Sequence, residues 1–309
     1  MNKLVILGSV AAAAIAHPIS LEMANKVKES ASSWEPYAPH ENPLKDLSHQ
    51  QLMGLLGTTF ETPNGADIPA YTSLPGAAPT DFDARVQWPD CVHEVRDQQS
   101  CGSCWAFGAS EALSDRFCVA SEGKINVVLS PEDMVECDSK NMGCQGGNLL
   151  FAWTYLMKTG IVADSCTPYV AGSGNAPTCN KRNTCTDGSA FKKYKCSDKV
   201  HPKNISDIKK ELSTNGPMEG AFTVYEDFFN YKSGVYQHVE GDMAGGHAIK
   251  VLGYGTENGL DYWLCANSWG PSWGMDGFFK IKQGDSGIDD SMWSCTPDVN
   301  GALHEVYFE

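Results

Sequence analysis

Three side chains that lie far apart in the chain have the types needed for nucleophilic catalysis by a thiol. Cys104 lies in the run Cys-Gly-Ser-Cys-Trp (101–105), His247 follows two glycines, and Asn267 precedes Ser-Trp-Gly. A thiolate is the nucleophilic form of cysteine, a nearby imidazolium lowers the pKa of the thiol, and an amide oxygen can orient the imidazole. We therefore expect Cys104 to attack a substrate, His247 to transfer protons and Asn267 to hold His247.

Each of these residues has a plainer interpretation when it is considered alone. Cys104 could be one half of a disulfide in a chain with twelve cysteines, and a histidine that enters an apolar strand is normally a packed or surface residue. The motif around Cys104, followed far downstream by His247 and then by Asn267, has the order that is typical of papain and the cathepsins. The agreement of three elements in this order favours the catalytic interpretation.

The element that must position Cys104 is predicted to be a helix. From Cys104 onward, apolar residues recur at the spacing of one helix face: Trp105, Ala109, Ala112, Leu113 and Phe117. The unpaired N–H groups and the positive end of the dipole at the start of a helix stabilise a thiolate. Gln98 can donate its side-chain N–H2, together with the backbone N–H of Cys104, to an oxyanion that develops on a peptide carbonyl.

The chain beyond residue 78 is predicted to be helical first and rich in strands later. One helix opens with Ser130 as its N-cap and Pro131 at its first position, and another covers 149–156 and closes at Gly160. After the loops of 166–200 and a short helix at 206–212, β-branched and aromatic runs bounded by glycine predict four strands: Glu219–Tyr225, Ala248–Tyr254, Tyr262–Asn267 and Phe278–Lys282. This order predicts an α+β fold with a cleft where the two layers meet.

The N-terminal residues have the composition of processing segments. Residues 1–16 have a charged start, a short apolar core and a small-x-small ending, which predicts a secretory signal peptide; a membrane anchor is disfavoured because the run is too short for roughly 30 Å of hydrocarbon. Residues 17–77 are polar, contain prolines and lack cysteine, which predicts a pro-peptide with short helices at 21–30 and 47–56. A disordered leader is the alternative. The catalytic domain is then 78–309.

Composition excludes several classes of protein. The net charge of −15 over 309 residues argues against a nucleic-acid partner, which requires basic patches. Twelve cysteines indicate an oxidising compartment, and the close pairs 101/104 and 179/185 lack the partner pairs of a zinc site, so we expect no metal and no cofactor. No segment after residue 16 is long and apolar enough to span a membrane, and the sequon at Asn204 could carry a glycan.

Residues 80–297 resemble papain-like cysteine proteases, and cathepsin B in particular. The resemblance rests on the runs 97–109, 114–116, 216–222 and 231–238. It implies a papain-like two-domain fold, in which a helical left domain carries Cys104, a β-barrel right domain carries His247, and the active-site cleft lies between them.

The same resemblance implies which residues contact a peptide substrate. Glycine backbone pairs with the extended peptide, and two further side chains line the cleft: Gly146, Gly147, Gly246, Trp269 and Ser291. Ser291 stands where cathepsin B has an acidic residue at the floor of the pocket for the second residue before the scissile bond. A hydrophobic residue is therefore expected in that pocket rather than arginine.

Disulfide pairing is also implied by the resemblance. The expected pairs are Cys91–Cys118, Cys101–Cys144, Cys137–Cys179 and Cys166–Cys185. Cys196 and Cys295 lie on segments that neighbour each other in the family, so they are expected to pair, which leaves Cys265 as a buried free thiol.

The expected activity is that of a cysteine endopeptidase made as a zymogen. The stretch 55–60 resembles the cathepsin B pro-segment that lies in the cleft, and Gly57 suits a backbone passing close to Cys104. The region 166–185 lacks the histidines of the loop that makes cathepsin B a dipeptidyl carboxypeptidase, and Lys181 and Arg182 are interpreted as solvated loop charges. That carboxypeptidase activity, a secreted disulfide-rich binding module on a dead protease fold, and a papain-like transferase remain the alternatives.

We expect the partners to be peptide and protein substrates and the enzyme's own pro-peptide as inhibitor. The chain is expected to be a monomer in a lysosome, a comparable acidic vesicle or the extracellular space.

Overall fold

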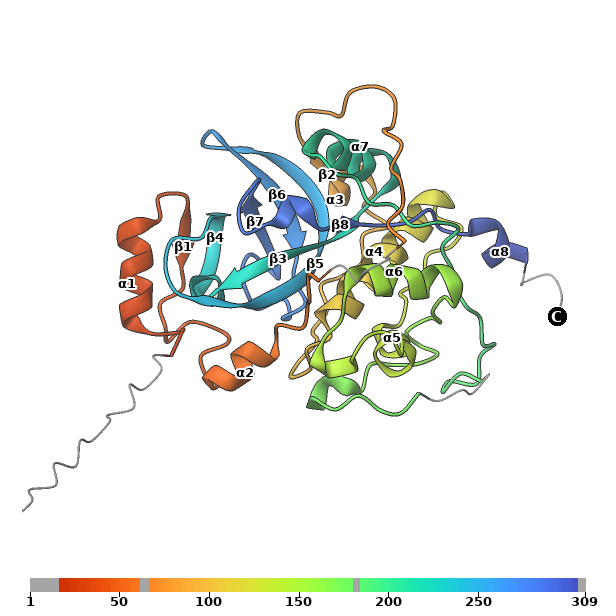
Figure 1. The fold of residues 1–309 in the computed structure, drawn as a ribbon, viewed down its shortest axis with the longest axis horizontal. Helices are drawn as coiled ribbons and strands as arrows, with labels where there is room; N and C mark the ends of the chain where they lie inside the picture. Colours follow the sequence, from red (N-terminus) through yellow and green to blue (C-terminus); the bar gives the residue numbers. More distant parts are fainter. Residues whose placement is uncertain (1–16, 62–66, 180–183, 305–309) are drawn as a thin grey trace, which may run out of the picture.

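The structure, a computed structural model, describes residues 17–61, 67–179 and 184–304. The predicted signal peptide (1–16) and the two loop charges Lys181 and Arg182 lie outside the described residues. Two lobes lie side by side, one built of helices and one built around a sheet (Figure 1). The predicted α+β class is confirmed.

The helical lobe is organised around one long, buried helix. Helix α4 (Cys104–Ala120) runs between the lobes, and its side chains are buried over almost its whole length. Helix α5 (Pro131–Cys137) starts where Ser130 Oγ accepts from the N–H of Asp133, and α6 (Leu149–Lys158) starts where Asn148 caps the N–H of Leu150. Short 3-10 turns lie between α5 and α6, at η1 (Gly143–Gln145), and after α6, at η2 (Ala171–Ser173).

The sheet lobe contains one mixed sheet. Its strands are β1 (Trp34–Pro36), β3 (Met218–Tyr225), β4 (Tyr231–Tyr236), β5 (Met243–Glu257), β6 (Leu260–Ala266), β7 (Phe278–Lys282) and β8 (Met292–Trp293), with β2 (Phe82–Asp83) pairing to β5. Within the described residues their order is β1-β4-β7-β6-β5-β3-β8, and only the β4–β7 pair is parallel.

The predicted β-barrel is therefore wrong in one respect, because the sheet is not closed. Its two edges are β1 and β8, and these strands do not pair with each other within the described residues. Strand β8 is only two residues long, and the opposite edge at β4 is covered by β1 from the N-terminal segment. A closed barrel requires the first and last strands to share hydrogen bonds.

The remaining helices connect these layers. They are α1 (Leu21–Ser30), α2 (His49–Gly54), α3 (Ala84–Gln87), α7 (Ile205–Asn215) and α8 (Val299–His304), with 3-10 turns at η3 (Glu226–Asn230) and η4 (Ile288–Asp290). Helix α7 covers part of β5, and α8 ends the described chain on the side of the helical lobe (Figure 1).

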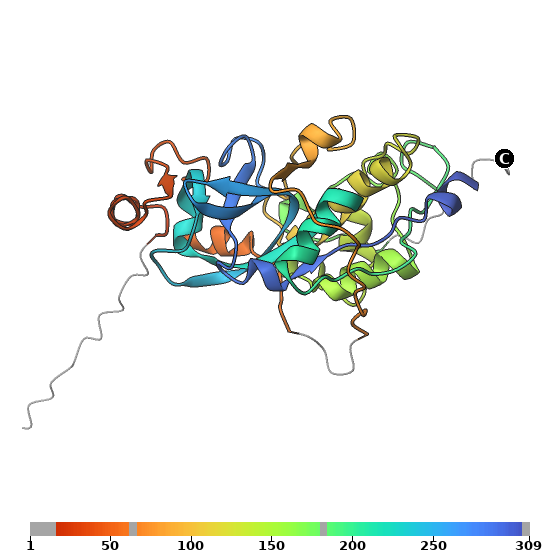
Figure 2. The same ribbon diagram turned by 90° about the horizontal axis from the view of Figure 1, so that it is seen from above.

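The N-terminal segment docks on the sheet lobe. Figures 1 and 2 show α1 and α2 beside the sheet, and Met23, Val27 and Leu52 enter the same core as the sheet aromatics Phe222 and Phe228. Helix α1 has the predicted bounds, and α2 is shorter than the predicted 47–56. Burial of these apolar side chains holds the segment against the sheet.

Five disulfides join the segments that the family resemblance implied. They are Cys91–Cys118, Cys101–Cys144, Cys137–Cys179, Cys166–Cys185 and Cys196–Cys295. Cys104 and Cys265 are free thiols, and both are buried. Among the described residues we find neither a helix suited to crossing a membrane nor a cluster of metal-binding side chains.

Candidate active site

Cys104 is the first residue of α4 and lies at the contact between the lobes. Its side chain is fully buried, and its sulfur accepts a hydrogen bond from the N–H of Gly57 at 3.3 Å. The Thr58 hydroxyl lies 3.2 Å from the same sulfur. The N-terminal segment therefore covers the candidate nucleophile.

His247 and Asn267 come from neighbouring strands of the other lobe. His247 lies on β5, Asn267 follows the end of β6, and these strands are antiparallel neighbours. The Nε2 of His247 lies 2.8 Å from Oδ1 of Asn267; because an amide oxygen only accepts, this nitrogen carries the proton. The indole of Trp269 lies 4.8 Å from the imidazole and shields this bond.

The second ring nitrogen of His247 remains available. Within the described part of the chain, Nδ1 is buried and has no hydrogen-bonding partner. The Cys104 sulfur also lies near the N–H of Ala248, the residue after His247. The cysteine and histidine thus approach each other from opposite lobes, with residues 57–58 filling the space at the sulfur.

Gln98 is held at the same point by its own hydrogen bonds. Its Oε1 accepts from the hydroxyl of Ser268 at 2.7 Å, which fixes the orientation of the amide. Its Nε2 donates to the carbonyl of Cys101 at 2.8 Å and to that of Leu55 at 2.9 Å. One amide proton therefore already binds a carbonyl oxygen of the chain that lies in the cleft.

The predicted substrate-binding glycines also contact this chain. Gly147 accepts from the N–H of Thr59 at 2.9 Å and donates to the carbonyl of Gly57 at 2.7 Å, while Gly246 accepts from the N–H of Thr58 at 3.0 Å. A Cβ on Gly146 would lie 2.7 Å from the Gly57 oxygen, and a Cβ on Gly246 would overlap the Thr58 carbonyl. Both lobes therefore present bare backbone to one extended strand.

A pocket of about 490 Å³ opens beside this strand and includes Ser291. Asp290 and the Phe60 ring of the N-terminal segment line it as well. His201 and Lys203 also line it, and the sequence analysis did not identify them because they lie in a loop without a motif. His201 stacks on Trp293 with ring centroids 3.9 Å apart, and burial lowers its pKa to about 4.

Burial favours the uncharged forms of the candidate catalytic pair. Desolvation raises the pKa of the Cys104 thiol, although hydrogen bonds from Thr58 and from backbone N–H groups oppose this. Desolvation lowers the pKa of His247 to about 4, opposed by the bond to Asn267. A protonated thiol beside a neutral imidazole is the unreactive state of such a pair.

We expect an alkylating reagent to modify Cys104 much more slowly in the chain that carries residues 17–77 than in the chain without them. Removal of the segment hydrates both groups, so the thiolate–imidazolium pair can form at a mildly acidic pH of about 5.5. The measurement is the rate of iodoacetamide labelling at Cys104, followed by peptide mass spectrometry. Equal rates in the two forms would contradict the assigned role of the segment.

Comparison with known proteins places this geometry in a family. Papain family cysteine protease is the family that matches residues 78–296. The chain is 39% identical to "Cathepsin B-like cysteine proteinase 4" of Caenorhabditis elegans, over 88% of this chain and 91% of the relative. It is 41% identical to "Cathepsin B-like CP3" of Giardia intestinalis, over 88% of this chain and 92% of the relative.

A solved structure extends the similarity into the N-terminal segment. The structure titled "proCathepsin B S9 from Trypanosoma congolense" matches with a TM-score of 0.83 and 31% identity, covering 91% of this chain and 99% of that one. The match of a proform over this length supports a pro-peptide in the present chain. The chain therefore belongs to the papain family of cysteine proteases, as a cathepsin B-like member.

Proposed function

We propose that the mature enzyme is an endopeptidase that uses Cys104 as nucleophile, His247 as proton carrier, Asn267 as the group that orients His247, and Gln98 as an oxyanion donor. The observation that carries this proposal is that the segment 55–59 passes between the two walls of the cleft at these residues. Cys104 and Gln98 contact it directly, and Gly147 on one wall and Gly246, beside His247, on the other pair with its backbone, as they would with an extended peptide substrate.

The chemistry follows from the position of each atom. The Cys104 thiolate attacks the carbonyl carbon of the scissile peptide, and the oxygen accepts hydrogen bonds from Gln98 Nε2 and the backbone N–H of Cys104. His247 protonates the leaving amine, and we assign this transfer to Nδ1 because Nε2 is bound to Asn267. Water then hydrolyses the thioester, with the neutral imidazole as base.

Residues 17–77 act as an inhibitory pro-peptide in this proposal. They supply an N–H and a hydroxyl to the sulfur, and neither group is an electrophile that a thiol can attack. They also supply the Leu55 carbonyl to Gln98. The segment thereby fills the nucleophile and oxyanion positions together.

The same proposal includes the processing and location of the protein: a signal peptide at 1–16, a pro-peptide boundary at residue 77, and a lysosomal or extracellular location. The five disulfides support an oxidising compartment.

Endopeptidase activity is proposed because the loop between Cys166 and Cys185 contains no histidine. Its cysteines are fully used in the disulfides Cys137–Cys179 and Cys166–Cys185. Capture of a substrate carboxylate at the end of a cleft requires a cation that donates hydrogen bonds to it. The two cations of this loop, Lys181 and Arg182, lie outside the described residues and are interpreted as solvated charges. We therefore propose that a long peptide extends through both ends of the cleft.

We expect the mature enzyme to cleave a peptide with a free C-terminus and its C-terminally amidated twin at the same internal bonds and at similar rates. Mass spectrometry of the products over time provides the measurement, and Cys104→Ala serves as the blank for contaminating proteases. Stepwise release of C-terminal dipeptides from the free acid, with the amidated twin left uncut, would instead establish a carboxypeptidase.

A further inference from the structure

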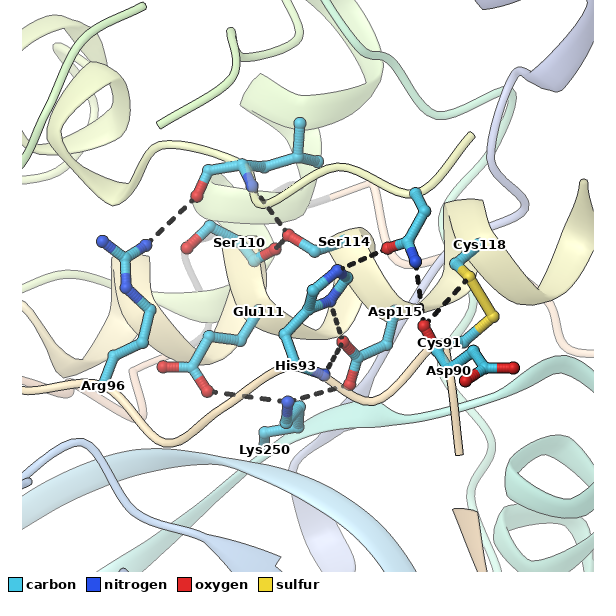
Figure 3. Close-up of polar contacts among 12 residues, drawn as sticks. Asp90, Cys91, His93, Arg96, Ser110, Glu111, Ser114, Asp115, Cys118 and Lys250 are labelled. Atoms are coloured by element: carbon cyan, nitrogen blue, oxygen red, sulfur yellow. Dashed lines mark hydrogen bonds and ion pairs between the residues drawn. A yellow bond between two sulfur atoms is a disulfide. The ribbon is translucent and has the colours of Figure 1, made fainter. Parts of the chain in front are cut away.

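A cluster of buried charges lies where α4 meets β5 (Figure 3). Nζ of Lys250 lies 2.8 Å from Oδ2 of Asp115 and 3.8 Å from Oε2 of Glu111. The exposed fractions of the three residues are 1%, 0% and 5%. Burial of an unpaired charge has a large desolvation cost, so buried charges of this kind are stable only when they are closely paired.

The cluster joins the two elements that carry the reacting groups. Asp115 and Glu111 lie on α4, which begins at Cys104, and Lys250 lies on β5, three residues after His247. Alternate residues of a strand share one face, so Ala248 and Lys250 both face α4. The N–H of Ala248 lies at the Cys104 sulfur. The ion pair of Lys250 with α4 therefore also positions the backbone of Ala248 beside the Cys104 sulfur.

Among the charged groups around Lys250, only Asp115 and Glu111 form ion pairs with it in the part of the chain that the structure describes. Glu219 lies opposite Lys250 on β3, but its Oε2 accepts from the indole N–H of Trp153 at 2.7 Å and, among the described residues, it forms no ion pair with Lys250. On the other side, His93 donates its backbone N–H to Oδ1 of Asp115 at 3.1 Å, and its ring Nδ1 lies 2.6 Å from the same oxygen. Arg96 contributes a further positive charge near Glu111. Asp115 is thus fixed from both sides.

A second buried charge, Arg116, fixes the far half of α4. It donates to the carbonyls of Gly216, Pro217 and Cys295 and pairs with Glu211, and none of these partners lies on β5. Small residues form the contact closer to Cys104: Gly108 on α4, Ala221 on β3 and Ala248 on β5. Apolar contacts are non-directional and tolerate a small sliding movement, whereas a buried charged hydrogen bond loses its energy when the atoms separate. The placement of β5 on α4 therefore depends on the Lys250–Asp115 bond, whereas Arg116 places the chain before β3 and after β8.

We propose that Lys250, through Asp115 and Glu111, is a positioning residue that sets the separation of Cys104 and His247. This inference rests on the proposed function, since it assumes that these two residues react as a pair. Lys250 contacts neither substrate nor sulfur and acts only through the placement of β5 on α4. A displacement of the order of 1 Å between reacting groups can cost about 100-fold in rate.

The test compares Lys250→Met with Lys280→Met in the mature enzyme. Lys280 is the matched control, because it pairs with Glu257 at 2.6 Å on β7 of the same sheet and has no ion pair to α4 among the described residues. We expect Lys250→Met to lower kcat by at least about tenfold with KM changed less than about threefold. Lys280→Met should leave both constants within about twofold. Lys250→Arg keeps the positive charge and should retain more of kcat than Lys250→Met, although the larger side chain must fit a closed site.

A second readout separates positioning from loss of stability. When His247 lies further from the sulfur, the imidazolium stabilises the thiolate less, so the pKa of the thiol rises. The pH at which Cys104 labelling reaches half its maximal rate should therefore rise in Lys250→Met, measured well below the unfolding temperature. This readout needs no peptide hydrolysis, so it also tests the inference if the proposed peptidase activity fails.

Two results would overturn the inference. One is a folded Lys250→Met enzyme with unchanged kcat and an unchanged labelling midpoint. The other is a less stable enzyme whose folded fraction labels with the wild-type pH profile. If Lys250→Met does not fold, Asp115→Asn replaces it, since asparagine keeps the volume and one accepting oxygen. Its labelling midpoint should rise in the same direction by a smaller amount, and an unchanged midpoint in folded Asp115→Asn overturns the inference equally.

Discussion

Replacement of Cys104 or of His247 by alanine is expected to abolish peptide hydrolysis, with kcat/KM falling by about 10⁴-fold or more. Cys104 forms and breaks the bond to the substrate, and His247 carries the proton to the leaving amine. Asn267→Ala is expected to have a smaller effect, because Asn267 only orients the imidazole through its 2.8 Å contact with Nε2. Initial rates on a fluorogenic peptide at mildly acidic pH provide the measurement.

The control for Cys104 is Cys265→Ala. Cys265 is the other free and buried thiol of the described residues, and it packs in the core of the sheet lobe. Its replacement should reduce thermal stability while leaving kcat/KM nearly unchanged at temperatures where the enzyme is folded. Comparable kcat/KM for the wild type and Cys104→Ala would end the proposal that this chain is a cysteine peptidase working through Cys104.

The second large effect is expected from Gly57→Ala in the form that retains residues 17–309. A Cβ at Gly57 would overlap the carbonyl of Gly102, so the segment could not keep its place at the Cys104 sulfur. Forced overpacking of this kind costs about 1–3 kcal/mol, which corresponds to ~5- to 150-fold weaker inhibition. We therefore expect Gly57→Ala to be active at neutral pH before any cleavage.

Gly54→Ala is the matched control, because a Cβ there meets no atom within 4 Å. Gly54 is the last residue of α2, where alanine favours the helix, so inhibition should be preserved. Initial rates must be taken while the mass of the chain is intact. Full activity of the uncleaved wild-type form at neutral pH would refute the inhibitory role of residues 17–77.

Acid is expected to release the wild-type segment. Lys26 pairs with Glu240 at 3.3 Å and Lys199 pairs with Asp67 at 3.5 Å, so these pairs join the segment to the rest of the protein. Because each of these pairs includes an exposed side chain, they contribute little to docking. The larger effect is expected from His247, which is fully buried with the segment docked and whose pKa desolvation lowers to about 4, so protonation of the imidazole favours the undocked form as the pH falls. Activity of the wild-type form should therefore rise with acidification, whereas Gly57→Ala should already be active and change less.

The sequence alone determined the parts of this protein that depend on local patterns. The helix at Cys104 follows from apolar residues at helical spacing, and the start of α5 follows from Ser130 and Pro131. The four predicted strands lie within or close to β3, β5, β6 and β7, because β-branched and aromatic runs bounded by glycine favour extended backbone. The candidate catalytic residues were found because their motifs are short and contiguous.

Strand β4 was not predicted because its local pattern is weak. Its residues 231–236 include Lys, Ser and a glycine at the centre, which weakens the strand pattern. It becomes a strand because β7 pairs with it on one side and β1 on the other. The same pairing leaves the sheet open, because β1 of the N-terminal segment, and not β8, covers the edge at β4.

Only the tertiary structure decided which distant side chains meet. Lys250 and Asp115 have no motif that links them, and they pair because α4 and β5 cross at the contact between the lobes. The contact of Leu55 with Gln98 also depends on packing. The N-terminal segment docks on the sheet lobe, and this docking places the Leu55 carbonyl at Gln98 Nε2. Local propensity acts over a few neighbouring residues, whereas these contacts depend on how the layers pack, and packing is a property of the whole chain.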